Sequence, residues 1–433
     1  MTGTCAQSPV VPGMRAVVVG AGKSGLAAAE LLCKLGAKVR LADRSADNVA
    51  PEARTAMAAL DVEMLFGPHS ADQFAGAGLV VLSPGVAVRN MRPYLPEAAR
   101  VMAETELAWS CVRHIPVLAV TGTNGKTTTV RLCARMLEEA GKTVFLGGNI
   151  GIPLSRFVLD GKSADVLVLE LSSFQLQTCE ELRPHVAVLT NITVDHLDYH
   201  LDMQEYIDAK MRIFAHQTEE DVALLGPGLK EMPARYALRA QVGYISATGR
   251  FPQSSLRGAH NRLNMEAAFQ ACAEFGVTEE VAARAISGFS AAPHTLEIVG
   301  SVRGVTFVDD SKATTVDSLR VALEAFDGPI ALLAGGVYKG GDLSSVNELL
   351  RQKVKAVGLY GRSREIFEAA WADVVELSYD TTMEAAARRL LDTLPSGGVL
   401  LLAPATSSFD QYSGYVARGD DFRRIHALLA GEE

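Results

Sequence analysis

The chain has 433 residues, 48% of them hydrophobic, which is enough for several buried cores, and chains of this length usually form about two to four domains. The 41 basic residues against 50 acidic ones leave a formal net charge of −9, which argues against a general nucleic-acid binder. Six scattered cysteines argue against a disulfide framework, and the lack of a signal sequence or of a membrane-spanning apolar run predicts a cytoplasmic protein.

The N-terminal part predicts a βαβ unit. Its expected elements are, in chain order, a strand, a glycine-rich turn, a helix and a second strand, at Arg15–Val19, residues 20–25, residues 26–35 and residues 38–42. Alternation continues to a strand at residues 78–82 and the turn Ser83-Pro84-Gly85. We place the end of this domain at residue 104.

The first glycine-rich turn, Gly20-Ala21-Gly22-Lys23-Ser24-Gly25, has the GxGxxG spacing. Asp43 ends the following strand, where dinucleotide-binding folds place a ribose-binding acid. Taken alone, this pattern predicts NAD binding. The glycines are also explained by a tight turn with close helix packing, because a fold does not dictate its ligand. From these residues both interpretations stay open.

The second glycine-rich turn is Val120-Thr121-Gly122-Thr123-Asn124-Gly125-Lys126-Thr127-Thr128, between a buried strand at residues 116–120 and a helix that ends near residue 140. It resembles a P-loop, although Gly122 stands closer to Gly125 than the GxxxxGK[ST] spacing requires. In such a loop, backbone N–H groups surround a polyphosphate, Lys126 neutralises the β- and γ-phosphates, and Thr127 holds Mg²⁺. A chance GKT would not be expected at this strand-to-helix junction, so the sequence predicts ATP binding.

The remaining elements predict two further α/β regions. In the central region we expect strands at residues 165–170 and 185–189 and helices at residues 203–214 and 261–275. In the third region we expect a parallel, doubly wound sheet with strands at residues 304–308, 330–333, 356–360 and 398–402. The predicted fold class is therefore α/β with three domains: a Rossmann-like domain at 1–104, a P-loop-type ATPase domain at 105–293, and a Rossmann-like domain at 294–433.

Polar residues that follow these strands are candidate ligands. Glu170 ends an apolar run, where α/β folds place carboxylates for a bound metal, although a solvated strand end is the simpler interpretation. Asp195 and His196 lie in a polar run after the strand at residues 185–189, and they suit a metal or a substrate. A single histidine is more often structural, but this one has polar neighbours.

Other candidates lie on helices and in the third region. Lys210, on the helix at residues 203–214, is either a surface lysine or a functional one. Asn261 and Asn264 stand one turn apart inside a helix, where asparagine is unfavourable, which favours a polar task such as holding adenine or phosphate. The run from Asp309 to Thr315 and the turn at Asp410 concentrate charges and hydroxyls where a second substrate would dock.

Over residues 15–428 these motifs resemble the Mur ligase family. The GTNGKTT loop, the Glu170 segment, the DHLDYH run from Asp195, the HNxxNxxAA helix from His260 and the third-domain motifs stand in the family's order. Three features favour the family member that adds D-glutamate to UDP-N-acetylmuramoyl-L-alanine: Ser83-Pro84-Gly85, the ELSSFQL run from Glu170, and the DSKAT run from Asp310. The DNPR motif of the diaminopimelate- or lysine-adding relative is absent.

The resemblance implies an ATP-dependent ligase of peptidoglycan synthesis. ATP would phosphorylate the terminal carboxylate of UDP-N-acetylmuramoyl-L-alanine, and the amine of D-glutamate would attack the acyl phosphate and expel phosphate. Lysine and Mg²⁺ would offset charge on the transferring phosphoryl group. The first domain would then bind the diphosphate of the UDP-sugar rather than NAD. We expect a monomer with neither a nucleic-acid partner nor membrane insertion.

The resemblance also implies roles for individual residues. ATP would contact Gly122, Thr123, Asn124, Gly125, Lys126, Thr127, Thr128, Asn261, Asn264 and Asp310. One Mg²⁺ would be held by Thr127 and Glu170, and a second by His196 and a carbamylated Lys210. The UDP-sugar substrate would contact Ser24, Ser83, Asn149, Ser172, Gln175 and His196. The incoming glutamate would contact Lys312, Thr314, Lys339, Ser408 and Tyr415. The chemistry would depend on Lys126, Glu170, His196, Lys210 and Lys312.

Several positions depart from the family pattern. Asp309 and Thr315 stand where relatives commonly have asparagine, and Tyr415 stands where phenylalanine is usual. Arg44 and Ser45 replace the usual Thr-Arg order, which bears on the uracil and diphosphate contacts. Thr295 stands where arginine is typical, and threonine cannot supply that positive charge to the nucleotide phosphates.

Three other functions compete with this interpretation. A Mur-type ligase for another amino acid, including L-glutamate, would carry the same motifs. A nicotinamide-dependent dehydrogenase built on the first domain would leave the Lys126 loop unexplained. A nucleotide-binding regulator without ligase activity would not need Glu170, His196 and Lys210 together.

Overall fold

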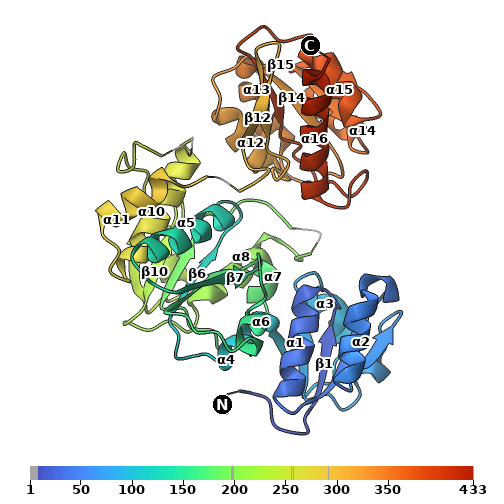
Figure 1. Ribbon diagram of the computed structural model, residues 1–433, viewed down its shortest axis with the longest axis vertical. Helices are drawn as coiled ribbons and strands as arrows, with labels where there is room; N and C mark the ends of the chain where they lie inside the picture. The colour runs from blue at the N-terminus through green and yellow to red at the C-terminus, as the bar shows by residue number, and fades with distance from the viewer. Residues whose placement is uncertain (1–7, 197–198, 255, 257, 291, 433) are drawn as a thin grey trace. The chain divides into compact units, whose positions relative to one another are not determined.

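The computed structural model describes residues 8–432 apart from residues 197–198, 255, 257 and 291. It contains three mainly parallel sheets with helices between their strands, coloured blue, green and orange to red in Figure 1, so the predicted α/β class is confirmed. Each sheet falls within one of the three expected domain ranges, and the boundaries at residues 104 and 293 stay predictions. By contacts the chain divides into two compact units, the first holding the first two sheets and the second holding the third sheet.

The first sheet has the strand order β3-β2-β1-β4-β5. Its strands are β1 (Arg15–Val19), β2 (Lys38–Asp43), β3 (Glu63–Phe66), β4 (Leu79–Leu82) and β5 (Arg100–Ala103). The helices are α1 (Lys23–Lys34), α2 (Pro51–Ala59) and α3 (Val88–Met91), and α4 (Glu104–Ser110) leads into the next sheet. The apolar strand β1 lies between β2 and β4, both parallel to it, so the glycine-rich turn that follows β1 opens at the centre of the sheet's carboxyl edge.

The central sheet has the order β11-β10-β9-β6-β8-β7, and all its strand pairs are parallel. Its strands are β6 (Val117–Thr121), β7 (Val144–Gly148), β8 (Val166–Glu170), β9 (Val186–Leu189), β10 (Val222–Leu225) and β11 (Gln241–Tyr244). Its helices are α5 (Lys126–Glu139), α6 (Leu154–Leu159), α7 (Ser173–Leu176), α8 (Met203–Met211), α9 (Met232–Arg235), α10 (Ala259–Ala273) and α11 (Glu279–Ser287).

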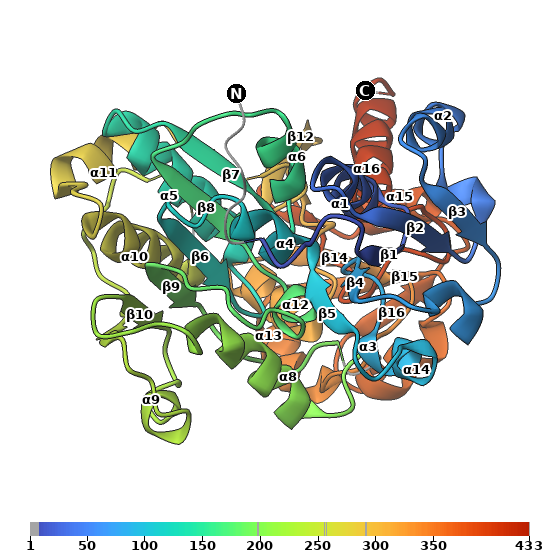
Figure 2. The same ribbon diagram turned by 90° about the horizontal axis from the view of Figure 1, so that it is seen from below.

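Strand β6 occupies the topological switch point of the central sheet. The connection that leaves β6 runs to one side, toward β7, and the connection that leaves its neighbour β9 runs to the other side, toward β10. The carboxyl ends of two such strands are where open α/β sheets bind their ligands. All residues of β6, β8 and β9 are buried, so their apolar composition explains why these strands form the middle of the sheet. Helix α5 packs over β7 and β8, as Figure 2 shows from below.

The third sheet has the order β12-β13-β17-β14-β15-β16. Its strands are β12 (Glu297–Val302), β13 (Val305–Asp309), β14 (Ile330–Gly335), β15 (Val354–Tyr360), β16 (Glu376–Tyr379) and β17 (Val399–Leu402). Its helices are α12 (Val316–Glu324), α13 (Asn347–Lys353), α14 (Arg364–Trp371), α15 (Met383–Leu391) and α16 (Tyr415–Ala430).

The four strands expected in the third sheet are parallel, as predicted, but the sheet also has an antiparallel strand at one edge that the sequence did not predict. Strand β12 pairs with β13 in the antiparallel sense through the two-residue turn Arg303-Gly304. Both turn residues have positive φ, at 51° and 75°, as a tight hairpin requires. Sequence patterns identify such hairpins by Asn-Gly or Asp-Gly, so a turn with arginine in the first position is not recognised. No helix among the residues described above is long and apolar enough to cross a membrane.

Candidate active site

The GTNGKTT turn joins β6 to α5 in a conformation that requires its glycines. Gly122 has a φ of 148°, and a Cβ there would lie 1.9 Å from the Thr190 hydroxyl oxygen. Gly125 has a φ of 85°, and a Cβ there would lie 2.4 Å from Oδ1 of Asn264. The Lys126 ammonium donates to the carbonyl oxygens of Gly122 and Thr123, both at 2.8 Å. The turn therefore holds its lysine above the N-terminus of α5, where helix dipole and N–H groups favour an anion.

A buried carboxylate stands beside this turn, at the end of β8. Glu170 is 2% exposed, and its Oε2 accepts a hydrogen bond of 2.7 Å from the Thr127 hydroxyl. Its Oε1 accepts a hydrogen bond of 2.9 Å from the side-chain amide nitrogen of Asn149. Asn149 is the residue that follows β7. The structure thus brings together three residues that the sequence placed at separate strand and helix ends. A carboxylate and a hydroxyl oxygen at this spacing suit a hard cation such as Mg²⁺.

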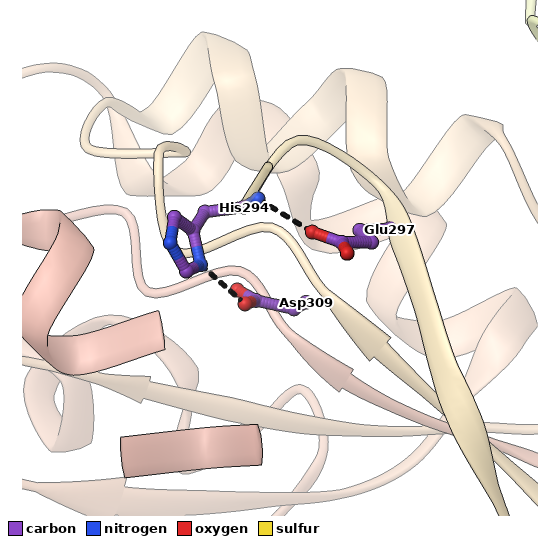
Figure 3. Close-up of side chains that lie close together, drawn as sticks. All are labelled: His294, Glu297 and Asp309. Carbon is purple, nitrogen blue, oxygen red and sulfur yellow. Dashed lines mark hydrogen bonds and ion pairs between the residues drawn. The ribbon is translucent and has the colours of Figure 1, made fainter. Parts of the chain in front are cut away.

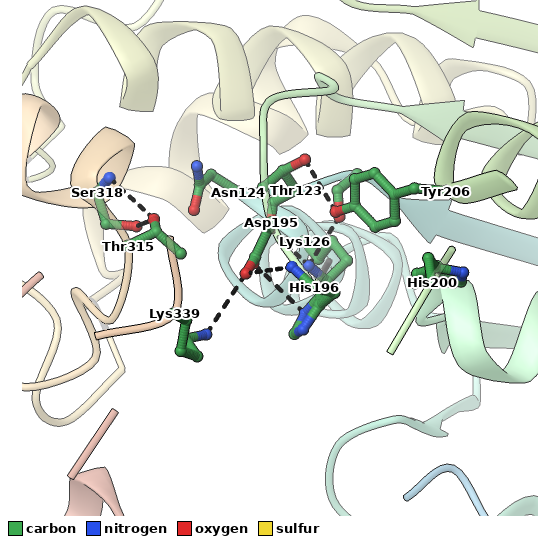
Figure 4. Close-up of polar contacts among 12 residues, drawn as sticks. Thr123, Asn124, Lys126, Asp195, His196, His200, Tyr206, Thr315, Ser318 and Lys339 are labelled. Carbon is green, nitrogen blue, oxygen red and sulfur yellow. Dashed lines mark hydrogen bonds and ion pairs between the residues drawn. The ribbon is translucent and has the colours of Figure 1, made fainter. Parts of the chain in front are cut away.

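Lys210 on α8 reaches the same turn from another side. Its side chain is 2% exposed, and its ammonium donates to the Gly122 carbonyl at 2.8 Å. The ammonium also lies 4.4 Å from the ring centre of Tyr206, one helical turn earlier. The Tyr206 hydroxyl is 3.0 Å from the Thr123 hydroxyl (Figure 4). Lys210 is therefore a buried lysine rather than a surface one. Tyr206 escaped the sequence prediction, although its i, i+4 spacing to Lys210 was a usable signal.

Asn264 on α10 and Asn191 after β9 line the turn as well. Asn264 is buried with its Oδ1 facing Gly125, and Asn261, one turn earlier, is also buried. Asn191 accepts at Oδ1 from the Asn124 backbone amide, at 2.9 Å. Asn191 follows a buried parallel strand, and that position at the carboxyl edge of the sheet was the signal that sequence reasoning overlooked. Thr128, on the first turn of α5, is partly buried.

The glycine-rich turn of the first domain is stabilised by hydrogen bonds to residues of the same domain. Both oxygens of Asp43 accept backbone N–H groups, from Ala21 at 2.7 Å and from Ser45 at 3.0 Å. A carboxylate engaged in this way stabilises the turn, which is a structural reason for its place at the end of β2. The Ser83 hydroxyl donates to the Gly20 carbonyl at 3.1 Å, and Ser24 lies partly buried in the first turn of α1.

Ser172 and Gln175 form the N-terminal cap of α7. The Ser172 hydroxyl and backbone amide both lie 3.0 Å from Oε1 of Gln175, and the Gln175 backbone amide donates to the Ser172 oxygen. The Gln175 amide nitrogen in turn donates to the Thr105 hydroxyl at 3.1 Å. This capping box positions both side chains just after Glu170.

Within the second unit, Asp195 lies between two site candidates. Its Oδ2 is 3.4 Å from Nε2 of His196, and its Oδ1 is 3.4 Å from the Lys339 ammonium (Figure 4). His196 has a left-handed φ of 57°, and its backbone amide donates to the Asp195 carboxylate. Leu197 and Asp198 of the same motif lie outside the described residues.

The turn that follows β13 carries the candidates of the third sheet. Asp310 is buried, and its Oδ1 accepts from the Leu296 backbone amide at 3.2 Å. Burial, with a smaller contribution from the neighbouring Asp309 charge, raises the pKa of the Asp310 carboxyl to about 7. Lys312 and Thr314 follow in the same turn. The hydroxyl of Thr295 is buried with no hydrogen-bond partner among the described residues.

Ser408 and Tyr415 flank a loop that an unpredicted arginine supports. Ser408 is buried after β17, and Tyr415 begins α16 with a partly exposed ring. Arg418, one turn into α16, is fully buried and donates to Ser311, to the Thr406 carbonyl and to the Gly335 carbonyl. It thereby ties together the segments that follow β13, β14 and β17. An arginine early in a helix is usually a surface residue, so the sequence position of Arg418 did not indicate that its side chain is buried.

Comparison with known proteins finds matches along nearly the whole chain. Three family models match in sequence order: the MurD-like N-terminal domain of Mur ligases over residues 14–104, the Mur ligase middle domain over residues 120–236, and the glutamate ligase domain of Mur ligases over residues 296–406. A UDP-N-acetylmuramoylalanine–D-glutamate ligase of Oleidesulfovibrio alaskensis is 56% identical, over 99% of this chain and 97% of the relative. One of the same name from Desulfosudis oleivorans is 38% identical over 94% and 95%.

The chain belongs to the Mur ligase family. Solved structures agree with this fold. MurF ligase of Thermotoga maritima in complex with ADP matches with a TM-score of 0.60 at 16% identity, over 91% of this chain and 95% of that one. MurF of Acinetobacter baumannii matches with a TM-score of 0.61 at 15% identity, over 96% and 93%. The family resemblance drawn from the motifs is therefore confirmed, and it settles the competition between the two glycine-rich turns against a dehydrogenase.

Proposed function

We propose that this chain is the Mur ligase that joins D-glutamate to UDP-N-acetylmuramoyl-L-alanine in peptidoglycan synthesis, with conversion of ATP to ADP and phosphate. The observation that carries the proposal is the Lys126 turn beside the buried Thr127–Glu170 pair, in a chain whose relatives of 56% identity bear that ligase name. A carboxylate is a poor electrophile, so amide formation needs its conversion to an acyl phosphate. The amine of D-glutamate then attacks the acyl carbon, and phosphate leaves.

In this proposal the central turn binds and aligns the triphosphate. The Lys126 ammonium, now bonded to two carbonyl oxygens of its own turn, moves onto the phosphoryl oxygens and offsets their charge. Backbone N–H groups at the start of α5 surround the phosphates, and Asn264 with Asn261 holds the nucleotide. Mg²⁺ fits the oxygen donors of Thr127 and Glu170, and when bound it supplies positive charge to the phosphates.

Lys210 belongs to this machinery as a carbamate. A buried ammonium in contact with a carbonyl oxygen and an aromatic face is a poor neighbour for a cation, whereas a carbamate offers oxygen ligands. We expect His196 to share the cation bound there. Dialysis against carbon dioxide-free buffer should lower activity, and bicarbonate should restore it. Activity that does not respond to bicarbonate, together with a bare amine in a crystal structure with Mg²⁺ and nucleotide, would remove this role.

The remaining site residues bind the two other substrates. The Ser24 and Ser83 hydroxyls flank the Gly20 turn, where we place the UDP-sugar diphosphate. Asn149, Ser172 and Gln175 contact the sugar–alanine part. In the second unit, Asp310 contacts the nucleotide, and the residues that contact glutamate are Lys312, Thr314, Lys339, Ser408 and Tyr415. We further propose that the protein acts as a monomer in the cytoplasm, where UDP-sugars and ATP are available.

The decisive experiment measures phosphate release from ATP with UDP-N-acetylmuramoyl-L-alanine and a panel of D- and L-amino acids. We expect release with D-glutamate and little with L-glutamate, D-aspartate or diaminopimelate. A preference for another amino acid would support the proposed ligase activity but contradict D-glutamate as its substrate. No release with any amino acid, from a folded protein, would contradict the ligase itself.

A further inference from the structure

His294 and Asp309, which have no role in the proposed function, lie buried together beside the turn that carries Asp310 and Lys312. Nδ1 of His294 is 2.7 Å from Oδ2 of Asp309 (Figure 3). Their side chains are 5% and 0% exposed. His294 precedes β12, and Asp309 is the last residue of β13, so the pair links two segments of the second unit where the third sheet presents its site residues.

The contacts around the pair cross-link these two segments. The second oxygen of Asp309, Oδ1, accepts the Ser311 backbone amide at 2.9 Å. The Lys312 backbone amide donates to the His294 carbonyl at 3.1 Å, and the Leu296 amide donates to Asp310 at 3.2 Å. Asp309, Asp310 and Lys312 are therefore each held by a hydrogen bond to the segment that begins at His294.

Helix α16 closes over the pair without leaving room for a side chain. A Cβ on Gly419 would lie 2.1 Å from Nδ1 of His294 and 2.8 Å from Oδ2 of Asp309. One turn later, Arg423 contacts Glu297 at 2.5 Å and approaches Asp309 at 3.9 Å. Glu297 in turn accepts the His294 backbone amide at 2.8 Å.

The backbone of this segment needs such support. His294 and Leu296 have left-handed φ values of 62° and 45°, which non-glycine residues rarely adopt. A conformation of this kind persists only where its surroundings over-determine it, and it concentrates where a precise geometry is needed. The imidazole, the carboxylate and the close glycine supply that over-determination.

The same residues also have the spacing of a cation site. One ligand atom from each of His294, Glu297 and Asp309 lies within 4.8 Å of the others. However, the Arg423 guanidinium already contacts the Glu297 carboxylate and stands near that of Asp309, so a positive charge is present without a metal. The imidazole and Asp309 are also engaged with each other at hydrogen-bond distance.

We infer that the His294–Asp309 pair positions the Asp310–Lys312 turn for substrate binding, while neither side chain touches a substrate. The inference rests on the proposed function in one respect, the assignment of Asp310 to the nucleotide and Lys312 to glutamate. A residue that acts in this way should change the KM values of the two substrates that the turn binds. It should leave alone the KM of the UDP-sugar, which the proposal assigns to the other unit.

His294→Ala tests this inference against a conservative variant. We expect the KM values for ATP and D-glutamate to rise about tenfold, as for loss of a buried hydrogen bond to a charged group, with the KM for the UDP-sugar unchanged. His294→Asn should restore most of the loss, because its amide nitrogen replaces Nδ1 as a donor to Asp309 and asparagine tolerates the left-handed conformation. His426→Ala is the matched control, since it removes another α16-associated imidazole, one packed on Phe307. It should lower the melting temperature and leave all KM values unchanged.

Hydrogen exchange at the Lys312 and Leu296 amides gives a readout that does not depend on activity. Both amides should exchange faster in His294→Ala, and in Asp309→Ala if the first variant folds poorly, but at the wild-type rate in His294→Asn. A second outcome is faster exchange in His294→Ala while the KM values stay unchanged in His294→Ala, Asp310→Ala and Lys312→Ala. That outcome would support the positioning of the turn by the pair, and it would contradict the substrate contacts proposed for the turn. Unchanged exchange and unchanged KM values would overturn the inference. So would Zn²⁺ or Mg²⁺ stabilising the wild type but not Asp309→Asn, which would make the cluster a metal site.

Discussion

Single residues determine how charge is handled at the central turn. Lys126 donates to two carbonyl oxygens of its own loop, and in the proposed function its ammonium moves from these onto the γ-phosphoryl oxygens. A lysine cation in that position offsets the charge on the transferring phosphoryl group. This makes Lys126 the residue whose loss should affect chemistry most and folding least.

We therefore predict that Lys126→Ala lowers the rate of ligation by roughly a thousandfold or more while the melting temperature stays near that of the wild type. Phosphate release and thermal melting, measured on the same preparation, check the two parts. Lys162→Ala, which removes an exposed lysine from the same unit, is the control and should keep full activity. Near-normal turnover in folded Lys126→Ala would remove ATP activation from the mechanism.

Glu104 shows the opposite case, a charge that the fold disfavours. It is buried at the start of α4, its Oε1 accepts the Ser155 backbone amide, and burial raises the pKa of its carboxyl above the ordinary value of 4.5. A carboxyl whose pKa is raised by folding stabilises the protein when protonated. That contribution is fully present below the unfolded pKa and is lost as pH rises through the folded pKa.

We predict that Glu104→Gln flattens part of the pH dependence of stability. Glutamine keeps an acceptor for Ser155 and cannot ionise, so the variant should gain stability relative to the wild type as pH rises from about 4.5 through the folded pKa. Urea unfolding at a series of pH values from 4 to 8.5 measures the difference. The exposed Glu52→Gln should show no such trend. A difference that shrinks with rising pH would mean that Glu104 is stabilised as the carboxylate.

At the scale of elements, the first glycine-rich turn joins its strand to its helix so closely that some, but not all, of its glycines are required. In the first domain, a Cβ on Gly25 would lie 1.8 Å from the Gly20 carbonyl oxygen, whereas a Cβ on Gly22 meets nothing within 4 Å. The GxGxxG spacing is therefore explained in part by close packing of α1 against the end of β1. The ligand is not needed to account for its third glycine.

This contrast gives a matched pair of variants. We predict that Gly25→Ala destabilises the first domain by about 1–3 kcal/mol or more, because a methyl group meets backbone that cannot move away. Gly22→Ala should cost less than about 1 kcal/mol, the usual range for a change at a helix N-cap. Chemical denaturation of both variants, with the UDP-sugar absent, measures the effect. Equal losses would show that the turn relaxes around added side chains.

At the scale of the whole molecule, the proposed site draws on both compact units. The Lys126 turn, Glu170 and Lys210 belong to one unit, and Asp310, Lys312 and Tyr415 belong to the other. Water also hydrolyses an acyl phosphate, so we expect the two units to close over it during the proposed reaction. Rigid units that carry different parts of a site are the usual basis of such closure.

We predict that binding an ATP analogue together with UDP-N-acetylmuramoyl-L-alanine reduces the radius of gyration in solution. Small-angle scattering with neither ligand, with each ligand alone and with both checks this. The Lys126→Ala variant, which should bind the nucleotide phosphates less tightly, should respond less at equal ligand concentration. Identical scattering profiles in all four states would contradict closure.

The α/β class, the three successive sheets and the main strand ends were predictable from the sequence, because apolar strands ended by glycine-rich turns are local patterns. The positions of Lys126, Thr127 and Glu170 were predictable for the same reason, because the first two directly follow such a turn and Glu170 ends such a strand. Their roles in the site stay predictions. The antiparallel β12 was not, because its turn uses Arg303, and hairpin patterns look for asparagine or aspartate before the glycine.

The sequence by itself thus determined which side chains stand at the ends of which elements. Only the tertiary structure decided what those side chains meet. Asn264 faces Gly125, Asp43 holds the Ala21 amide, and His294 bonds to Asp309, although the residues of each pair are well separated in sequence. Such pairings depend on strand order and on how closely a helix approaches a sheet. Both are set by packing of the whole core, which the local periodicity of a chain does not encode.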